Sequence, residues 1–136
     1  MNAVDAARAR GFTLRDPATP EDVNALLTFC PEAPMELVDL LRQTDGIEGD
    51  YGSPVVWSCL DIVGENRSMS SHPDYPALYW SFDQFLFVGA DVGSDFFGYR
   101  MLPAYEGADD LYRWDHENDS RVWFAGSLSD YVTRFA

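Results

Sequence analysis

Apolar side chains recur every three or four residues in three segments of the chain, which is the spacing of one helix face. The first segment follows Thr19, which can cap a helix that has Pro20 at its first position. Its apolar positions are Val23, Leu26, Leu27 and Cys30. The second runs from about Pro34 to Thr44 and is stopped by Asp45-Gly46, and the third follows Ser127. These patterns predict two helices near the N-terminus and one at the C-terminus.

Short β-branched and aromatic segments, separated by glycine-rich or acidic turns, fill the region between these helices. We expect strands over residues 55–60, 85–88, 96–101, 111–114 and 122–124. Residues 89–95 predict a hairpin turn in which Gly89 and Gly93 adopt turn conformations, and residues 115–120 predict a second, acidic turn. We expect only a helical turn near residues 60–65 and an exposed loop over residues 68–76.

The fold class that follows is α+β, with two N-terminal helices, an antiparallel sheet of four to six strands, and a C-terminal helix packed on that sheet. The 136 residues fit a single domain, in which residues 1–18 form a loosely ordered lead-in and residues 19–136 form the core. The side chains that we expect to be buried are Leu27, Leu41, Trp57, Phe87, Leu128 and Val132.

The charge is strongly unbalanced: 23 acidic residues stand against 9 basic residues, all of them Arg, which gives a formal net charge of −14. Such a chain repels nucleic acid and anionic membrane surfaces, because it meets like charge there. A basic protein is the partner that this charge favours. Residues 1–10 lack the apolar stretch of a secretory leader, and no apolar run is long enough to span a bilayer. We therefore expect a cytoplasmic protein that is a monomer or a weak dimer.

Metal binding and catalysis find little support in the sequence. Residues 115–119 carry alternating carboxylates, but an EF-hand loop would need Gly and Glu where Ser120 and Gly126 stand. Cys30 and Cys59 lack zinc-site spacing, and the chain contains neither a GxSxG nucleophile motif nor a phosphate-binding glycine motif. We expect no metal, no cofactor and no enzymatic activity.

Aromatic residues interleaved with acids in the expected loops are typical of a surface that binds a basic protein, because rings anchor a partner and carboxylates steer it. The candidate partner-binding residues are Tyr51, Trp80, Asp91, Asp95, Asp115, Glu117 and Asp119. The sequence leaves an alternative open: the rings close the edges of a small core, and the acids only keep the protein soluble.

Four motifs occur in one order along the chain. They are Gly11-Phe12 followed by the two helix starts, FLFVGADVGSDFFGY at residues 85–99, YRWDHE at residues 112–117, and AGSLSDYV at residues 125–132. Together they resemble the SUKH superfamily, which includes yeast cell-wall synthesis regulators and bacterial immunity proteins. The likeness covers about residues 11–136, and Ser94 stands where the family hairpin has its third glycine.

The resemblance implies an α+β scaffold that binds proteins and has no catalytic activity. In bacteria it most often implies an immunity protein that neutralises a toxin domain, commonly a nuclease, and the −14 charge favours such a cationic partner independently. Two alternatives stay open: an intracellular adaptor resembling the cell-wall synthesis regulators, and a nucleic-acid mimic that occupies basic grooves. No partner-contact residue carries over from the family.

Overall fold

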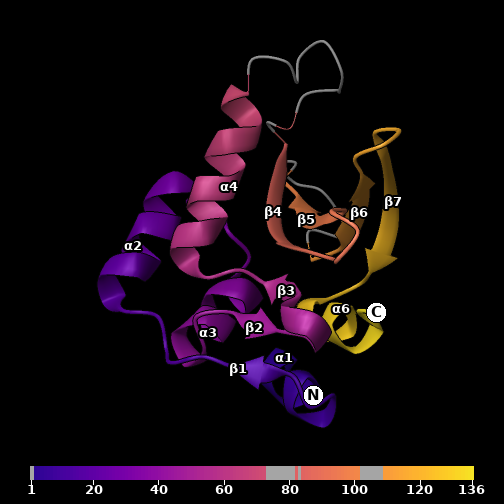
Figure 1. The fold of residues 1–136 in the computed structure, drawn as a ribbon. Helices are drawn as coiled ribbons and strands as arrows, with labels where there is room; N and C mark the ends of the chain where they lie inside the picture. Colours follow the sequence, from indigo (N-terminus) through magenta and orange to yellow (C-terminus); the bar gives the residue numbers. More distant parts are fainter. Residues whose placement is uncertain (1, 73–81, 83, 102–108) are drawn as a thin grey trace.

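The structure combines helices with two antiparallel sheets (Figure 1). The computed structural model describes residues 2–72, 82, 84–101 and 109–136. The helices are α1 (Ala3–Ala9), α2 (Pro20–Phe29), α3 (Met35–Gln43), α4 (Cys59–Ser71) and α6 (Leu128–Arg134), with a short 3-10 helix η1 (Asp50–Gly52). The strands are β1 (Thr13–Leu14), β2 (Ile47–Glu48), β3 (Pro54–Val56), β4 (Phe85–Ala90), β5 (Phe96–Arg100), β6 (Leu111–Asp115) and β7 (Ser120–Ala125). The predicted α+β class and C-terminal helix are confirmed.

The strands divide between a small sheet in the order β1-β2-β3 and a larger meander in the order β4-β5-β6-β7. Helix α6 packs against β7 and α1, and α4 runs beside β4 (Figure 1). The four strands predicted between residues 85 and 124 are those of the meander, and the two turns between them lie where the sequence placed them. The meander therefore brings both turns to one end of one sheet.

Two of the predicted helix starts are confirmed by their caps. The Thr19 hydroxyl accepts the Asp22 N–H at 3.2 Å, and the Ser127 hydroxyl accepts the Asp130 N–H at 3.1 Å. The third start is also confirmed, because α3 begins directly after Pro34. Each side-chain cap satisfies a backbone donor that has no partner within the helix.

The predicted loosely ordered lead-in over residues 1–18 is wrong, because its described part, residues 2–18, is ordered and packs on the core. Helix α1 buries its small side chains, and Arg10 donates hydrogen bonds to the carbonyls of Val132 and Thr133 near the C-terminus. The Phe12 ring meets Phe135 edge to face at 6.4 Å. Alanine gives a weak hydrophobic signal in a sequence, yet its small size allows the close approach of α1 and α6.

The predicted strand over residues 55–60 is too long, and the helical turn near residues 60–65 is a full helix. Strand β3 ends at Val56, and α4 begins at Cys59 and continues to Ser71. The Ser58 hydroxyl caps α4 by accepting the Asp61 N–H, and Asp45 accepts the Cys59 N–H at 2.8 Å. These two hydrogen bonds, one local and one from a residue 14 positions away, fix the start of the helix at Cys59. The predicted loop over 68–76 is helical as far as Ser71, and residues 73–76 lie outside the described residues.

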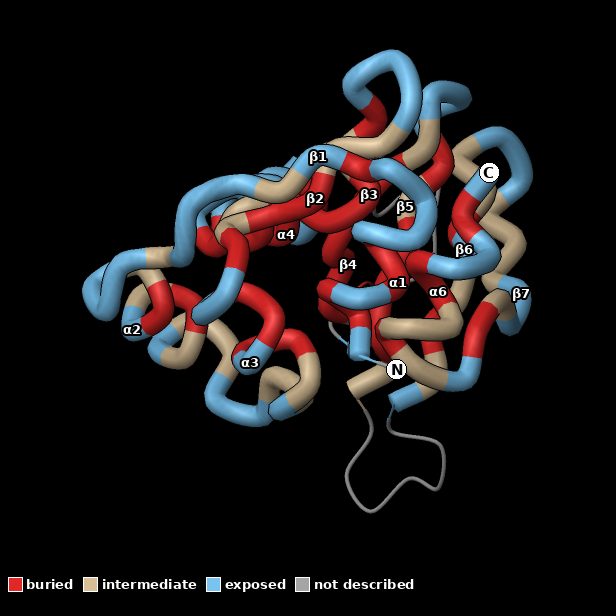
Figure 2. The backbone as a smooth tube through the Cα atoms, turned by 90° about the horizontal axis from the view of Figure 1, so that it is seen from below, coloured by how far each residue is buried: buried red, intermediate tan, exposed pale blue. Residues whose placement is uncertain are grey.

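The core lies between the helices and the two sheets, as the buried backbone in Figure 2 shows. Leu41, Trp57, Phe87, Leu128 and Val132 are buried as predicted. Leu27 is only half-buried, because its neighbour Leu26 takes the position that faces the core.

Gly89 and Gly93 do not supply turn conformations: neither has a positive φ, and Ser94 takes the left-handed position of the hairpin with φ 70°. Gly89 lies within β4, where a Cβ would fall 2.0 Å from the Val55 carbonyl oxygen of β3. The absence of a side chain therefore permits the two sheets to touch at this point.

The free edge of β4 is closed by a side chain. Asn66 of α4 accepts the Phe87 N–H at 2.9 Å and donates to the Phe87 carbonyl at 2.8 Å, so it takes the place of a neighbouring strand. Its amide also donates to the Ile62 carbonyl within α4, at 2.7 Å. One residue further along β4, the Trp57 N–H donates to the Val88 carbonyl at 2.7 Å. The edge of the sheet thus meets its partners inside the molecule.

A half-buried carboxylate joins three elements. Glu36 of α3 accepts the Tyr99 hydroxyl of β5 and the Leu128 N–H of α6 on the same oxygen, Oε1, both at 2.9 Å. Burial raises the pKa of Glu36, and the two hydrogen bonds offset this only in part. The carboxylate thus links α3, β5 and α6, but its partial burial disfavours the ionised form.

Replacement of Asn66 should test whether its side chain satisfies the backbone groups at the edge of β4. Asn66→Ala leaves the N–H and C=O of Phe87 without partners, and we expect the free energy of unfolding to fall by about 2–5 kcal/mol. Asn66→Asp, which cannot donate to the carbonyl and buries a charge, should be no better at neutral pH. Urea unfolding measures both, with Ser70→Ala on the exposed side of α4 as the control. Equal stability of the Asn66→Ala and Ser70→Ala proteins would contradict the edge closure.

Two replacements of Glu36 should separate its hydrogen bonds from its charge. Glu36→Ala leaves the Tyr99 hydroxyl and the Leu128 N–H unpaired, which should cost about 1–3 kcal/mol of unfolding free energy. Glu36→Gln keeps an acceptor oxygen and removes the charge, so it should match or exceed the parent at pH 7. Because the folded state raises the pKa of Glu36, the parent loses stability as the pH rises through that pKa, and the Gln protein should not. Urea unfolding at several pH values tests this, and a Gln protein as unstable as the Ala protein would refute it.

Candidate partner-binding site

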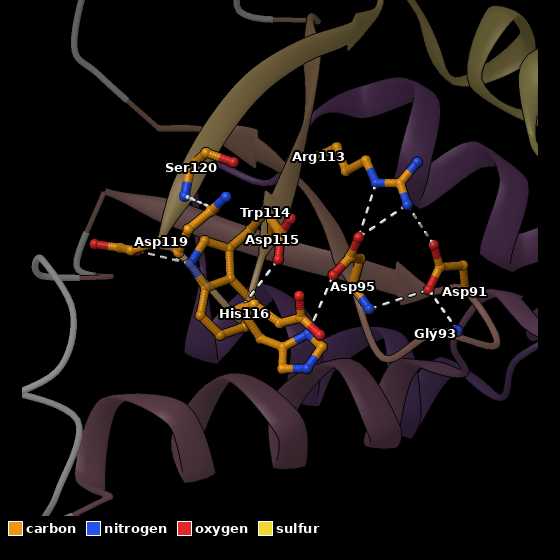
Figure 3. Close-up of polar contacts among 11 residues, drawn as sticks. Asp91, Gly93, Asp95, Arg113, Trp114, Asp115, His116, Asp119 and Ser120 are labelled. Atoms are coloured by element: carbon orange, nitrogen blue, oxygen red, sulfur yellow. Dashed lines mark hydrogen bonds and ion pairs between the residues drawn. The ribbon is translucent and has the colours of Figure 1, made fainter.

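The two turns of the meander bring five of the seven predicted binding residues together (Figure 3). Asp91 and Asp95 belong to the turn between β4 and β5. Asp115 is the last residue of β6, and Glu117 and Asp119 belong to the turn between β6 and β7. We call these five residues the two-turn acidic cluster. Its members are separated by as many as 28 positions in the sequence, and the antiparallel pairing of β5 with β6 is what joins them.

Arg113 of β6 holds the first turn against that strand. Its Nε and Nη2 donate to Asp95 Oδ2 at 3.0 and 2.8 Å, and Nη2 also donates to Asp91 Oδ2 at 3.0 Å (Figure 3). The guanidinium lies 5.7 Å from the centre of the Phe97 ring on the neighbouring strand. One cation thus fixes two carboxylates, and ion pairs of this kind give the cluster a defined shape.

Asp95 is a buried acid of the cluster, with 11% of its side chain exposed. Its Oδ1 lies 3.1 Å from Nδ1 of His116. Burial raises the pKa of Asp95, but the hydrogen bonds from Arg113 and His116 outweigh burial and hold the pKa below its ordinary value. Asp95 is therefore ionised at neutral pH and engaged inside the protein.

Asp91 and Asp119 also work within the structure. Asp91 Oδ1 accepts the N–H groups of Gly93 and Asp95 and closes the first turn. Asp119 has φ 58°, and its Oδ1 accepts the Trp114 indole N–H at 2.7 Å and the Arg121 guanidinium at 3.0 Å. These acids shape the two turns, so they are not simple docking charges.

Asp115 and Glu117 face solvent more openly. Glu117 is exposed and Asp115 is half-buried, and the Glu117 N–H donates to Asp115 Oδ1 at 2.9 Å. Among the described residues, neither side chain takes part in an ion pair. These two carboxylates are therefore the members of the cluster that a basic partner can reach without breaking an internal ion pair.

Of the two predicted aromatic anchors, only Tyr51 lies within the described residues. Tyr51 lies in η1, where it has a left-handed backbone with φ 60° and is 99% exposed. A tyrosine that is both strained and fully exposed is unusual for a residue that only packs the fold. Trp80 lies outside the described residues.

Sequence reasoning treated the acids as a surface charge and missed the side chains that organise them. Arg113 and His116 hold Asp95, and Trp114 holds Asp119. A signal was available for Arg113: it is the basic residue of a strand that leads into an acidic turn, and a second acidic turn lies beside it in the meander. Also missed were Val122 and Trp123, which β7 leaves largely exposed.

Within the described part of the chain, one group of side chains could hold a metal ion. One ligand atom each from Asp95, Asp115 and His116 lies within 4.8 Å of the others. Asp95, however, already binds His116 through Oδ1 and Arg113 through Oδ2, so a cation would compete with both. The expected absence of a metal stays a prediction.

The cysteines are poor nucleophiles. Burial raises the pKa of the Cys30 thiol, and burial together with the nearby Asp45 raises the pKa of Cys59 to about 12. Both are therefore protonated at neutral pH, and the thiolate is the reactive form.

Replacement of Asp95 should remove an acid-sensitive contribution to stability. The folded state lowers the pKa of Asp95, so its pairing stabilises the protein above the ordinary value of 3.8 and is lost as the pH falls through the folded-state pKa. Asp95→Asn should therefore cost about 1–2 kcal/mol at neutral pH and progressively less below pH 4. Urea unfolding at a series of pH values tests this, with Glu117→Gln as the matched control. A cost that does not shrink in acid would show that Asp95 acts through shape alone.

No helix in the described part of the chain is both long and apolar enough to cross a bilayer. A comparison of the sequence with protein-family models finds no match, and a comparison with curated proteins finds none either. The resemblance to the SUKH superfamily therefore remains a prediction from the motifs.

Proposed function

We propose that the protein is a non-catalytic binding protein for a basic protein partner, and specifically an immunity protein that neutralises a nuclease-type toxin by direct contact. The observation that carries the proposal is the two-turn acidic cluster, in which Arg113 and His116 fix a frame of carboxylates and leave Asp115 and Glu117 open. The motif resemblance supports the same function.

A prearranged acidic surface suits tight binding. Asp91, Asp95 and Asp119 are held by hydrogen bonds before a partner arrives, so binding does not have to order them. Less conformational entropy is then lost on association. Asp115 and Glu117 can accept arginine or lysine side chains, because the described residues offer them no competing cation.

The net charge of −14 acts at longer range. Opposite charge raises the rate at which two proteins meet, and an immunity protein must capture its toxin quickly. A nuclease has a cationic surface because it binds nucleic acid, so it is the class of toxin that this charge fits best. The protonated state of Cys30 and Cys59 agrees with a role that involves no covalent chemistry.

An intracellular adaptor is the second candidate, and the exposed side chains of Val122 and Trp123 on β7 favour it. The two side chains are adjacent in a strand and point to opposite faces of the sheet, so each offers a separate apolar contact that does not depend on the charge of the partner. The two functions differ in how binding responds to salt: toxin capture through the cluster weakens as salt rises, and docking on β7 does not.

Charge reversal of the open acids should slow association with a cationic toxin. We expect Asp115→Arg with Glu117→Arg to lower the association rate constant about tenfold or more at low salt, with a smaller change in the dissociation rate constant. Glu32→Arg with Glu65→Arg is the matched control, because it changes the net charge equally at exposed positions elsewhere.

The measurement is binding kinetics against a basic toxin domain encoded by a neighbouring gene, where one is found, together with protection of cells that express that toxin. Equal effects of the two double variants would show that net charge acts without a local site. A chain that binds no such toxin and protects no cell would leave the adaptor function as the better one.

A further inference from the structure

A pocket of about 200 Å³ is lined by residues of α1, α3 and α6. Helix α1 lies at the end of the molecule that carries the N-terminus (Figure 1). None of its lining residues belongs to the two-turn acidic cluster. Its lining residues are Asn2, Ala3, Val4, Glu36, Asp39, Leu40, Gln43, Leu128 and Ser129. A water molecule occupies roughly 30 Å³ in the liquid, so the pocket has the size for an organic group.

The polar side of the pocket is acidic. Glu36, Asp39 and Gln43 are spaced i, i+3, i+7 along α3, which places them on one face of that helix. Two of the three are carboxylates, and the described lining includes no basic residue. The pocket therefore presents negative charge without a counter-charge among the residues that line it.

Glu36 is prepared to bind a cation. The Tyr99 hydroxyl and the Leu128 N–H both donate to Oε1, which fixes the orientation of the carboxylate. No hydrogen bond of the described residues goes to Oε2, so that oxygen keeps its capacity to accept. Burial raises the pKa of Glu36 because it disfavours the charged form, and a cation bound at Oε2 would offset that cost.

The other walls of the pocket are apolar. Ala3, Val4, Leu40 and Leu128 contribute them, and all four are buried. Aliphatic walls beside two carboxylates match a ligand with a hydrocarbon stem and a charged end, the form of lysine and arginine side chains and of simple alkylamines.

We propose that this pocket binds an alkylguanidinium or alkylammonium group, with the charged end at Glu36 and Asp39 and the stem against the apolar walls. The inference is independent of the proposed function, because it concerns another part of the surface and a small ligand. The group can come from a free amine or from a basic side chain of a protein, and both share this chemistry.

Titration with n-butylguanidinium tests the pocket, and n-butylurea, which has a similar shape and no charge, is the matched ligand control. Binding is followed by two-dimensional NMR of the amides of Leu40, Gln43 and Leu128. We expect the dissociation constant of the cation to be at least about fivefold lower than that of the urea, because a charged hydrogen bond is the stronger one. Nα-acetyl-arginine amide distinguishes the sources: if it binds equally well, a protein side chain fits, and if it does not, only a free cation fits.

Glu36→Gln and Asp39→Asn should each weaken binding of n-butylguanidinium about threefold or more, and the double variant should abolish the preference for the cation over the urea. Glu65→Gln on exposed α4 removes the same charge elsewhere and should change nothing. Glu36→Gln keeps the acceptor for Tyr99 and Leu128, so the spectrum of the folded protein is retained and reports on binding.

Any one of three results would overturn the proposed cation site. They are no amide shift on addition of n-butylguanidinium, equal binding of n-butylguanidinium and n-butylurea, or a loss of affinity in Glu65→Gln as large as in Glu36→Gln. These results would leave toxin binding untouched, since that is measured on Asp115 and Glu117. Conversely, a chain that binds no toxin but selects the cation in this pocket would refute the proposed function and support the pocket.

Discussion

The two sheets meet where the backbone of β3 presses against β4, and this contact organises the rest of the molecule. The Val55 carbonyl lies so close to Gly89 that no side chain fits between them, and the same carbonyl accepts the Tyr131 hydroxyl of α6 at 2.6 Å. Asn66 covers the same edge of β4 at Phe87, whose N–H and carbonyl it binds. An open strand edge exposes unpaired N–H and C=O groups that invite other chains, so burying this edge fixes β4 as an internal element. The meander then extends in one direction only, away from α4.

That direction decides where the acids gather. Consecutive antiparallel strands, here of five or six residues, place every second connection at the same end of the sheet. The turns after β4 and β6 therefore lie together, and both are rich in aspartate. Carboxylates at such short range repel one another, and Arg113 offsets the repulsion by binding two of them. The cluster is thus a consequence of the topology combined with a single well-placed cation.

The sequence predicted those elements whose signal is local. Apolar periodicity located α2, α3 and α6, and the alternation of aromatic residues located the four strands of the meander. It failed where distant partners decide the structure. Helix α1 depends on contact with α6, and α4 depends on Asp45, which is 14 positions away. The sequence composition identified the acids of the cluster. Which of them form internal ion pairs depends on the strand register that places Arg113 beside Phe97.

The positions of the arginines decide which of the acidic side chains are paired inside the protein. A uniform excess of carboxylates would only keep a protein soluble and would weaken its folded state through self-repulsion. Here the arginines are placed selectively: Arg113 and Arg121 hold acids that shape the turns, Arg134 pairs with Asp130 of its own helix, and Arg10 binds backbone carbonyls. None of them lies against the half-buried carboxylate of Glu36 in the pocket of α3. These arginines therefore leave the charge of Glu36 uncompensated, and a cation bound in the pocket would offset it, so such binding would also stabilise the folded state.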